Sequence, residues 1–543
     1  MRGLASLLLF SLLAVATARA ERFVYEPVSD ADDGQLVDGF SWDSNPGLGF
    51  ADALLNLGQE GASTYDNSLA FRLTDLAEGQ SVAHAVLRLN EQGGAISSGL
   101  TVQISGALSL DPLAAAGAAR FALPRTANTV FWTIPAAWDS SGQRIAKYEE
   151  TPDLSPVIEE IIGQSGWDAG AKDAVLFLEV FSAVGDNVVR YDDLHGSVGG
   201  NAGIEPGRLI VCEGFRDAFW GKELLCRPQP GSVEVNVIPH AAADAYVEWG
   251  TDGISFPFST AQTAVAGQTA HEFLINGLSS DTRYSYRLQS RPAGGGAFEA
   301  GPVRSFVTLP VPGEEARICL TADIHVTNQL ALGLDSQMSL LEDALDFMSG
   351  YLADPYHAWV DLGDLVVIRA QRVVLDQEET EQRYRTAREY VDLIGHSVPL
   401  VAIRGNHEEV NGWDDDGSPN NSAIWSGKML LKYFPPPLPD AFVSGNDVSY
   451  PNLGLPGNYF AFDIGSVRLR ALDPFLFSTT RPHNGHGETG GSLNGWDWTL
   501  GQQQYDWLRD DLIAHPSTFS VVGIHHLTSC YAGPGQYYGR GGV

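Results

Sequence analysis

The stretch Val398-Pro-Leu-Val-Ala-Ile-Arg-Gly-Asn-His-Glu408 passes directly from apolar side chains to polar ones. A short apolar run of this length is typical of a buried strand. The polar group that follows it, Asn406, His407 and Glu408, includes side chains that transition metals bind. The stretch therefore predicts a strand that ends at a metal-type cluster.

Three other apolar segments also end at such clusters. Asp323 and His325 follow the first of them, Asp364 follows the second, and the pair His525-His526 follows the last. We expect strands at 317–322, 357–362, 398–403 and 519–524, and helices at 337–352, 378–394 and 503–513. Strands that alternate with helices favour an α/β fold with a mainly parallel or mixed sheet.

The four clusters are expected to meet, because ligands in α/β folds gather outside the carboxyl ends of the strands. One Asp-x-His pair alone is usually surface or capping chemistry, but four clusters in this order indicate a site. Two metal ions about 3.5–4 Å apart can hold the attacking and leaving oxygens of a phosphoryl displacement. A bridging water becomes hydroxide near neutral pH, and a histidine that binds no metal can protonate the leaving group.

The order of these motifs resembles that of the calcineurin-like metallophosphoesterases, which show D-x-H, G-D, G-N-H-[ED] and a lone histidine. The resemblance covers about residues 314 to 543 and implies an α/β domain of the αββα type. It implies that Asp323 and His325 hold a first metal ion and that Asp364 bridges to a second.

The same resemblance assigns Asn406 and His525 to the second metal ion and makes His407 the general acid. His526 replaces His525 as the ligand if the match between this sequence and the family motif is shifted by one residue. Fe, Zn, Mn and Mg all remain open as the two metals. The expected activity is hydrolysis of a phosphate ester by a hydroxide that the metals activate.

Two departures from the family pattern bear on this reading. No G-H-x-H motif follows His525, so we expect the sequence to be incomplete at its C-terminus and the site, as written, to bind metal weakly. Purple acid phosphatases carry a tyrosine three residues after the bridging aspartate, where this chain has Val367. The coloured iron–phenolate bond is therefore expected to be absent.

Residues 21–214 contain many short alternating segments between turn signals, which predict a β-sandwich. Asn67-Ser-Leu-Ala-Phe-Arg-Leu and the closing Pro206-Gly-Arg-Leu-Ile-Val resemble parts of the DNRLRE-type, carbohydrate-binding-like sandwiches of secreted bacterial proteins. The resemblance implies polysaccharide as a candidate partner. A spacer or adhesion module is an equally weighted alternative, because a fold alone does not fix a function.

Residues 217–310 predict a second β domain, in which the stretch from Gly277 to Leu288 resembles a loop and strand of fibronectin type III domains. Tyr284 and Tyr286 are expected to serve core and corner packing there. A domain of this kind stands before the catalytic domain in purple acid phosphatases. That arrangement implies that the substrate is a phosphate monoester.

The N-terminus and the composition indicate export. Residues 1–20 combine Arg2, a short apolar run and a small-residue end, as signal peptides do, and the run is too short to span a bilayer.

With 33 Lys+Arg against 67 Asp+Glu, the net charge of −34 argues against a nucleic acid or an anionic membrane as partner. Four cysteines are too few for a disulfide scaffold, although Cys212 and Cys226 could pair; Cys319 is expected to be a buried thiol.

The sequence thus predicts an exported metallophosphoesterase, periplasmic or extracellular, with two β-sandwiches before the catalytic domain. The expected boundaries are a signal peptide at 1–20, a first sandwich at 21–214, a fibronectin type III-like domain at 217–310 and a phosphoesterase domain at 314–543. A phosphodiesterase or nucleotidase of the same superfamily is the first alternative. A catalytically inactive glycan-binding or adhesion protein is the second.

Overall fold

The protein is described by a computed structural model. The structure describes residues 22–25, 34–39, 41–43, 54–95, 99–134, 147–192, 207–212, 219, 222–325, 356–368, 376–481, 499–516, 519–525, 530–531 and 537–538. The expected signal peptide, the expected helix at 337–352 and His526 lie outside these residues.

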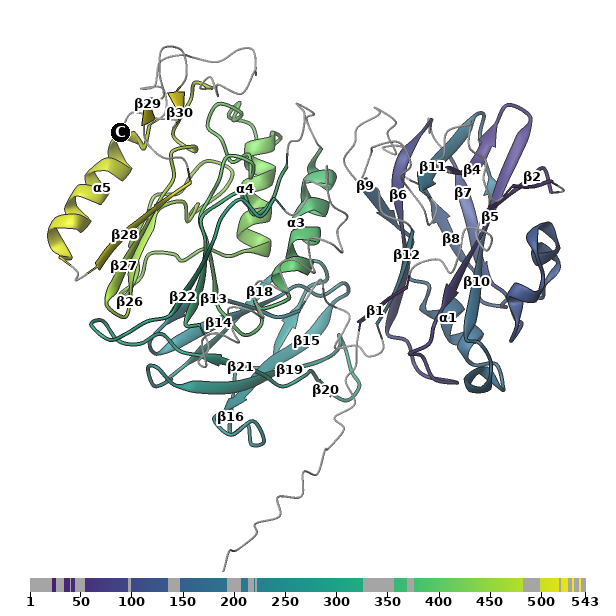
Figure 1. Ribbon diagram of the computed structural model, residues 1–543, viewed down its shortest axis with the longest axis horizontal. Helices are drawn as coiled ribbons and strands as arrows, with labels where there is room; N and C mark the ends of the chain where they lie inside the picture. The colour runs from purple at the N-terminus through teal and green to yellow at the C-terminus, as the bar shows by residue number, and fades with distance from the viewer. Residues whose placement is uncertain are drawn as a thin grey trace, which may run out of the picture.

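The N-terminal part is a β-structure whose strands are hydrogen-bonded into one twelve-stranded sheet. Its strands are β1 (Arg22–Tyr25), β2 (Gly34–Val37), β3 (Ser41–Asp43), β4 (Leu54–Glu60), β5 (Ser63–Arg72), β6 (His84–Ala95), β7 (Thr101–Gly106), β8 (Val130–Thr133), β9 (Lys147–Glu150), β10 (Asp173–Ser182), β11 (Asn187–Asp192) and β12 (Arg208–Cys212). Figure 1 shows the sheet folding over itself, with β6 and β12 in one layer and β5 and β10 in the other. The alternating sequence pattern produces this arrangement, because every second side chain faces the space between the layers.

The core of this part fills that space. Leu69 of β5, Leu87 of β6, Leu176 of β10 and Leu209 of β12 are all buried in it. The helix α1 (Ser155–Ile162) adds Ile161 and its apolar neighbours to the same core. The short 3₁₀ segments are Pro112–Ala114, Gly117–Ala122 and Trp167–Ala169.

The second part consists of short antiparallel strands around a separate core. Its strands are β13 (Leu224–Gln229), β14 (Ser232–Val237), β15 (Ala243–Gly250), β16 (Phe258–Ser259), β17 (Thr263–Val265), β18 (His271–Asn276), β19 (Arg283–Pro292), β20 (Glu299–Ala300) and β21 (Arg304–Val307). Tyr284 and Tyr286 are buried, as predicted, and the hydroxyl of Tyr284 accepts a hydrogen bond from the backbone N–H of Ser279 at 3.0 Å.

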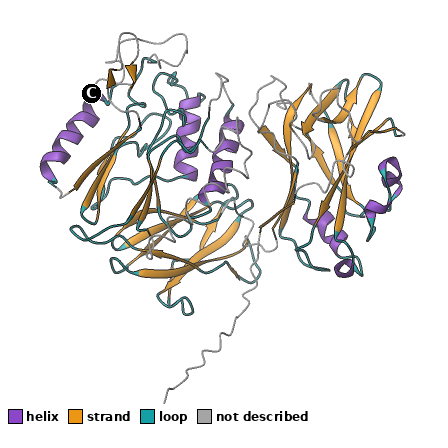
Figure 2. Cartoon of the chain, viewed as in Figure 1, coloured by secondary structure: helices purple, strands orange, loops and turns teal. Residues whose placement is uncertain are grey.

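The C-terminal part places two sheets face to face, with helices outside them (Figures 1 and 2). Its elements are β22 (Ile318–Thr321), β23 (Ala358–Asp361), α3 (Gln377–Val391), β24 (Leu400–Ala402), α4 (Ser422–Tyr433), β25 (Ser444–Gly445), β26 (Phe460–Ile464), β27 (Val467–Leu472), α5 (Gly501–Ala514), β28 (Phe519–Ile524), β29 (Cys530–Tyr531) and β30 (Tyr537–Tyr538). The first sheet contains the parallel strands β24, β23 and β22, and the second runs β25-β26-β27-β28. Buried side chains of both sheets, such as Val360 and Leu469, share one core.

The second and third parts are joined through a common sheet. Its order is β18-β14-β13-β24-β23-β22, and β13 meets β24 in a parallel pair between Cys226 and Leu400. The backbone N–H of Leu225 also donates to the carbonyl of Gly395 at 2.9 Å. The second part therefore continues directly into the first sheet of the C-terminal part.

The cysteines correct one sequence-based alternative. Cys212 lies on β12 and Cys226 on β13, and both are buried and form no disulfide, so the pairing that their spacing allowed is not formed. Cys319 on β22 is also a buried free thiol, as predicted.

Candidate metal centre and active site

The predicted site residues lie just beyond the ends of four strands. Asp323 and His325 follow β22, Asp364 follows β23, and Asn406 and His407 follow β24. The fourth cluster comes from the other sheet, because His525 is the residue directly after β28. The site thus lies at one end of the two packed sheets, at the carboxyl ends of their strands.

Asp364 is the centre of the cluster. Its carboxylate oxygen Oδ2 lies 3.0 Å from Nε2 of His525, 3.3 Å from Nε2 of His325 and 3.9 Å from Nε2 of His407. Asp323 approaches the same group, with Oδ1 3.7 Å from Nε2 of His325. Ligand atoms of two overlapping sets, His325-Asp364-His407 and Asp323-Asp364-His525, lie within 4.8 Å of one another.

Three of these residues adopt an uncommon backbone conformation. Asp323, His325 and Asp364 have φ angles of 54°, 53° and 59°, in the left-handed region that non-glycine residues rarely occupy. Hydrogen bonds between the loops hold this conformation: the N–H of Asp323 donates to the carbonyl of Gly363 and that of His325 to the carbonyl of Asp364, both at 2.9 Å. Such strain is typical of functional sites, where the surrounding structure enforces it.

Gly363 and Gly405 allow the two central loops to approach each other. A Cβ atom on Gly405 would lie 2.1 Å from Oδ1 of Asp364, and one on Gly363 would lie 2.7 Å from the backbone nitrogen of Gly405. Neither space admits a methyl group. The glycines before Asp364 and Asn406 are therefore required by packing around the central carboxylate.

Two buried acids, to which the sequence analysis assigned no role, support these loops. The carboxylate of Glu408 accepts backbone N–H groups from Gly405 at 2.7 Å, Val366 at 3.0 Å and Asp364 at 3.1 Å. Asp361 accepts the hydroxyl of Thr321 at 2.7 Å in the same way. The sequence signal for Glu408 was its place directly after Asn406-His407; a strand residue such as Asp361 carries no comparable signal.

The side chain of Glu408 is 2% exposed, and this burial raises its pKa to about 7. Burial also raises the pKa of Asp361, to about 8. For Asp364, burial opposes ionisation, but hydrogen bonds from His325 and His525 outweigh it and lower the pKa of the carboxyl below its usual range. Asp364 thus remains ionised among the imidazoles.

For two of the imidazoles the pKa is raised, whereas that of Asp364 is lowered. Burial disfavours the charged form of His525, yet its hydrogen bond to Asp364 raises its pKa to about 9. The same carboxylate raises the pKa of His325. Nδ1 of His525 lies 3.1 Å from the carbonyl oxygen of Leu362, which leaves Nε2 to face Asp364. A carbonyl contact of this kind orients a metal-binding histidine.

The structure brings together Asp323, His325, Asp364, His407 and His525. Asn406 is half-buried in the same loop as His407. The backbone N–H of His407 donates to Oδ1 of Asp364 at 2.8 Å, so this loop is tied to the central carboxylate. His526, the alternative ligand, lies outside the described residues.

A carboxylate surrounded by imidazoles at the strand ends of two packed sheets defines the site of a metal-dependent hydrolase. Residues 316–541 match the model of the family described as calcineurin-like phosphoesterase, and this part of the chain belongs to that family. The protein therefore carries a metallophosphoesterase domain, and the predicted superfamily is confirmed.

Comparisons with other proteins give weaker results. No curated protein matches the chain. A structure titled as that of PhoD is 14% identical, with 56% of this chain and 61% of that chain covered and a TM-score of 0.38. A β-glucuronidase from Bacteroides uniformis is 8% identical, with coverages of 71% and 47% and a TM-score of 0.28. A β-galacturonidase from Eisenbergiella tayi is 11% identical, with coverages of 77% and 70% and a TM-score of 0.28. Likenesses this slight carry no argument about function.

Proposed function

We propose that the protein is an exported metallophosphoesterase that hydrolyses phosphate monoesters, with diesters or nucleotides as the alternative substrates. The observation that carries the proposal is the position of Asp364, whose carboxylate oxygen Oδ2 faces imidazoles from three different loops. Export rests on the N-terminal sequence pattern. No helix in the described part of the chain is long and apolar enough to cross a bilayer.

The residues fit a pair of metal ions. Carboxylate and imidazole groups are suitable ligands for Fe, Zn and Mn, and the two overlapping sets of ligands share Asp364. Following the family pattern, Asp323 and His325 would hold one ion, Asn406 and His525 the other, and Asp364 both. The distances alone group the side chains differently, with Asp323 beside His525 and His325 beside His407. Bound ions would supply a hydroxide nucleophile and neutralise the phosphate charge.

His407 is proposed as the general acid. Its Nε2 is the most distant of the three from Asp364, and its side chain is 34% exposed against 5% for His525. An accessible imidazole can reach the leaving oxygen and donate its proton there, whereas a buried one is held by its partners. The loop that carries His407 is fixed by its N–H bond to Asp364.

Hydrolysis of p-nitrophenyl phosphate and bis-p-nitrophenyl phosphate, with and without EDTA and with added Mn, Zn or Fe, tests the proposal. We expect metal-dependent turnover that prefers the monoester. Asp364→Asn should reduce kcat/KM by roughly 10³-fold, and His407→Ala should reduce kcat by about 10²–10⁴-fold.

The matched control is His515→Ala, which removes an exposed imidazole at the end of α5, outside the cluster. Its activity should equal that of the parent protein. If the folded, metal-loaded chain hydrolyses neither ester, the proposal is overturned, and the inactive binding-protein alternative stands in its place.

A further inference from the structure

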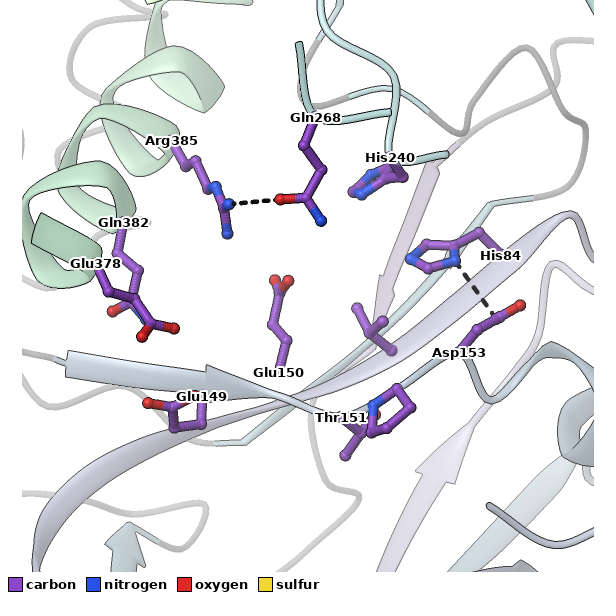
Figure 3. Close-up of a pocket in the computed structure, with 12 residues that line it drawn as sticks. His84, Glu149, Glu150, Thr151, Asp153, His240, Gln268, Glu378, Gln382 and Arg385 are labelled. Carbon is purple, nitrogen blue, oxygen red and sulfur yellow. Dashed lines mark hydrogen bonds and ion pairs between the residues drawn. The ribbon is translucent and has the colours of Figure 1, made fainter. Parts of the chain in front are cut away.

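A cavity of about 320 Å³ lies where the three parts of the molecule meet (Figure 3). His84 and Glu150 line it from the N-terminal sheet, His240 from the second part, and Gln382 and Arg385 from α3 of the phosphoesterase domain. It is formed by different residues from those of the metal centre. No part of the chain could form this cavity alone.

The chemistry of the cavity is polar. Ligand pockets are usually lined by apolar and aromatic side chains with few polar groups. Here carboxylates, amides, imidazoles and a guanidinium converge from three sides, and Figure 3 shows Glu378 and Gln382 reaching from α3 towards the residues of the N-terminal sheet. Such a lining favours a ligand that is itself rich in hydrogen-bonding groups.

Gln382 gives the strongest indication of a ligand. Its side chain is only 6% exposed, and its amide makes no hydrogen bond in the described structure, although it borders the cavity. Its amide is not among the enclosed polar atoms of the described structure, so it opens onto the cavity and can bond to a ligand there. An amide both donates and accepts, and a hydroxyl group satisfies both functions.

The protein itself provides partners for two of the four acids that line the cavity. Glu150 accepts two hydrogen bonds from Arg88, at 2.8 and 3.1 Å. Asp153 accepts backbone N–H groups of Ala85 and Ser155 and faces Nδ1 of His84 at 3.4 Å. Among the described residues, groups of acids and histidines close enough to hold a metal ion occur only at the catalytic centre. Because two lining acids are already bonded, Arg385 adds a positive charge and the described residues there include no metal-type group, we take hydrogen bonding to a neutral ligand as the main interaction.

The two histidines add a flat surface to the cavity. The rings of His84 and His240 lie against each other, tilted, across the boundary between the first and second parts, with centroids 4.6 Å apart and an interplanar angle of 30°. Carbon-bound hydrogens of a ligand can pack on such rings while its hydroxyls reach the polar groups.

We propose that this junction cavity binds a neutral, polyhydroxylated ligand of monosaccharide size, with the amide of Gln382 as its principal hydrogen-bonding anchor. The ligand would contact all three parts at once and thereby favour their assembled arrangement, because a ligand stabilises the state that binds it. This site is independent of the phosphoesterase reaction.

Saturation-transfer NMR of the full chain with glucose, galactose, mannose, N-acetylglucosamine and myo-inositol tests the proposal, with putrescine as a cationic probe. We expect at least one neutral compound to bind saturably. Gln382→Leu, which removes both hydrogen-bonding functions at similar volume, should weaken that binding about tenfold or more. Gln382→Glu, which removes the amide donor, should also weaken it.

The matched control is Gln377→Leu, at the exposed first residue of the same helix and outside the cavity. It should leave the affinity unchanged. The proposal is overturned if no neutral compound binds saturably, if putrescine alone binds, or if Gln382→Leu and Gln382→Glu both bind as the parent does. None of these readouts requires catalytic activity.

Discussion

The metal centre and the junction cavity are both built from polar side chains, but they are assembled differently. At the metal centre each residue follows a strand of one domain. Short segments such as Gly363-Asp364 and Gly405-Asn406-His407 therefore contain the side chains of the site. At the cavity, single residues such as His84, His240 and Gln382 come from three separate parts. The first kind of site is visible as a set of motifs, whereas the second exists only after the parts have packed.

This difference extends to the way in which the two sites are held. Around Asp364, glycines without room for a Cβ and strained backbone angles fix the ligands tightly. Around the cavity, long side chains such as Arg385 and Gln268 meet at 3.4 Å, and several lining groups are exposed. We therefore expect substitutions at the metal centre to act strongly on function and those at the junction to act weakly.

Among residues that are not themselves proposed ligands or the proposed acid, Glu408 provides the largest expected effect. Glu408→Gln keeps the shape of the side chain but replaces one acceptor oxygen with an NH₂ group, so at least one of the three backbone N–H groups loses its acceptor. The loops of Asp364 and Gly405 should then shift relative to each other. We expect metal affinity and kcat/KM to fall about 10–100-fold, as for other residues that orient metal ligands, measured by metal titration and steady-state kinetics.

Glu381→Gln is the matched control, since Glu381 is a partly buried carboxylate of α3 that bonds to Lys432 and Tyr433 away from the metal centre. It should alter stability without altering metal affinity. Equal metal affinity in Glu408→Gln and the parent protein would show that Glu408 stabilises the domain generally and does not position the ligands.

The sequence predicted the strands of the catalytic domain and the residues at their ends, because a buried apolar strand and a following cluster are local patterns. It did not show that β28, which leads to His525, belongs to a different sheet from β22, β23 and β24. Strand pairing depends on contacts between distant segments, which periodicity does not report. The same reason explains why the shared sheet of β13 and β24 and the cavity at Gln382 were not predicted.

The boundary between the second part and the catalytic domain should respond to acid through His396. Burial, assisted by the positive charges of Arg304 and Lys222, lowers the pKa of His396 to about 3. Its ordinary value is 6.5, so the unfolded chain binds the proton more tightly, and stability that is present above pH 6.5 is lost as the pH falls. Between pH 6.5 and pH 5 this one group should cost about 2 kcal/mol.

His396→Gln should therefore show a shallower loss of unfolding free energy than the parent over that range, measured by urea unfolding at half-unit pH steps. The difference between the two proteins at pH 8, where the imidazole is neutral in both states, serves as the internal reference. Parallel curves from pH 8 to pH 5 would show that His396 is hydrated in the folded protein.

The contact between the N-terminal part and α3 should show the smallest effect. Arg88 of β6 donates to Glu150 in its own sheet and to Glu389 of α3 at 2.8 and 3.1 Å, so one guanidinium joins the two parts. Because Arg88 is shared between two carboxylates, removing Glu389 leaves it paired with Glu150. We therefore expect a coupling energy of only about 1 kcal/mol from a double-mutant cycle of Arg88→Met and Glu389→Gln. Phosphoesterase activity should be unchanged in Glu389→Gln, while ligand binding at the cavity should weaken slightly.

If the changes in unfolding free energy caused by the two substitutions are strictly additive, the two parts do not share this contact in solution. The cavity could not then form as described.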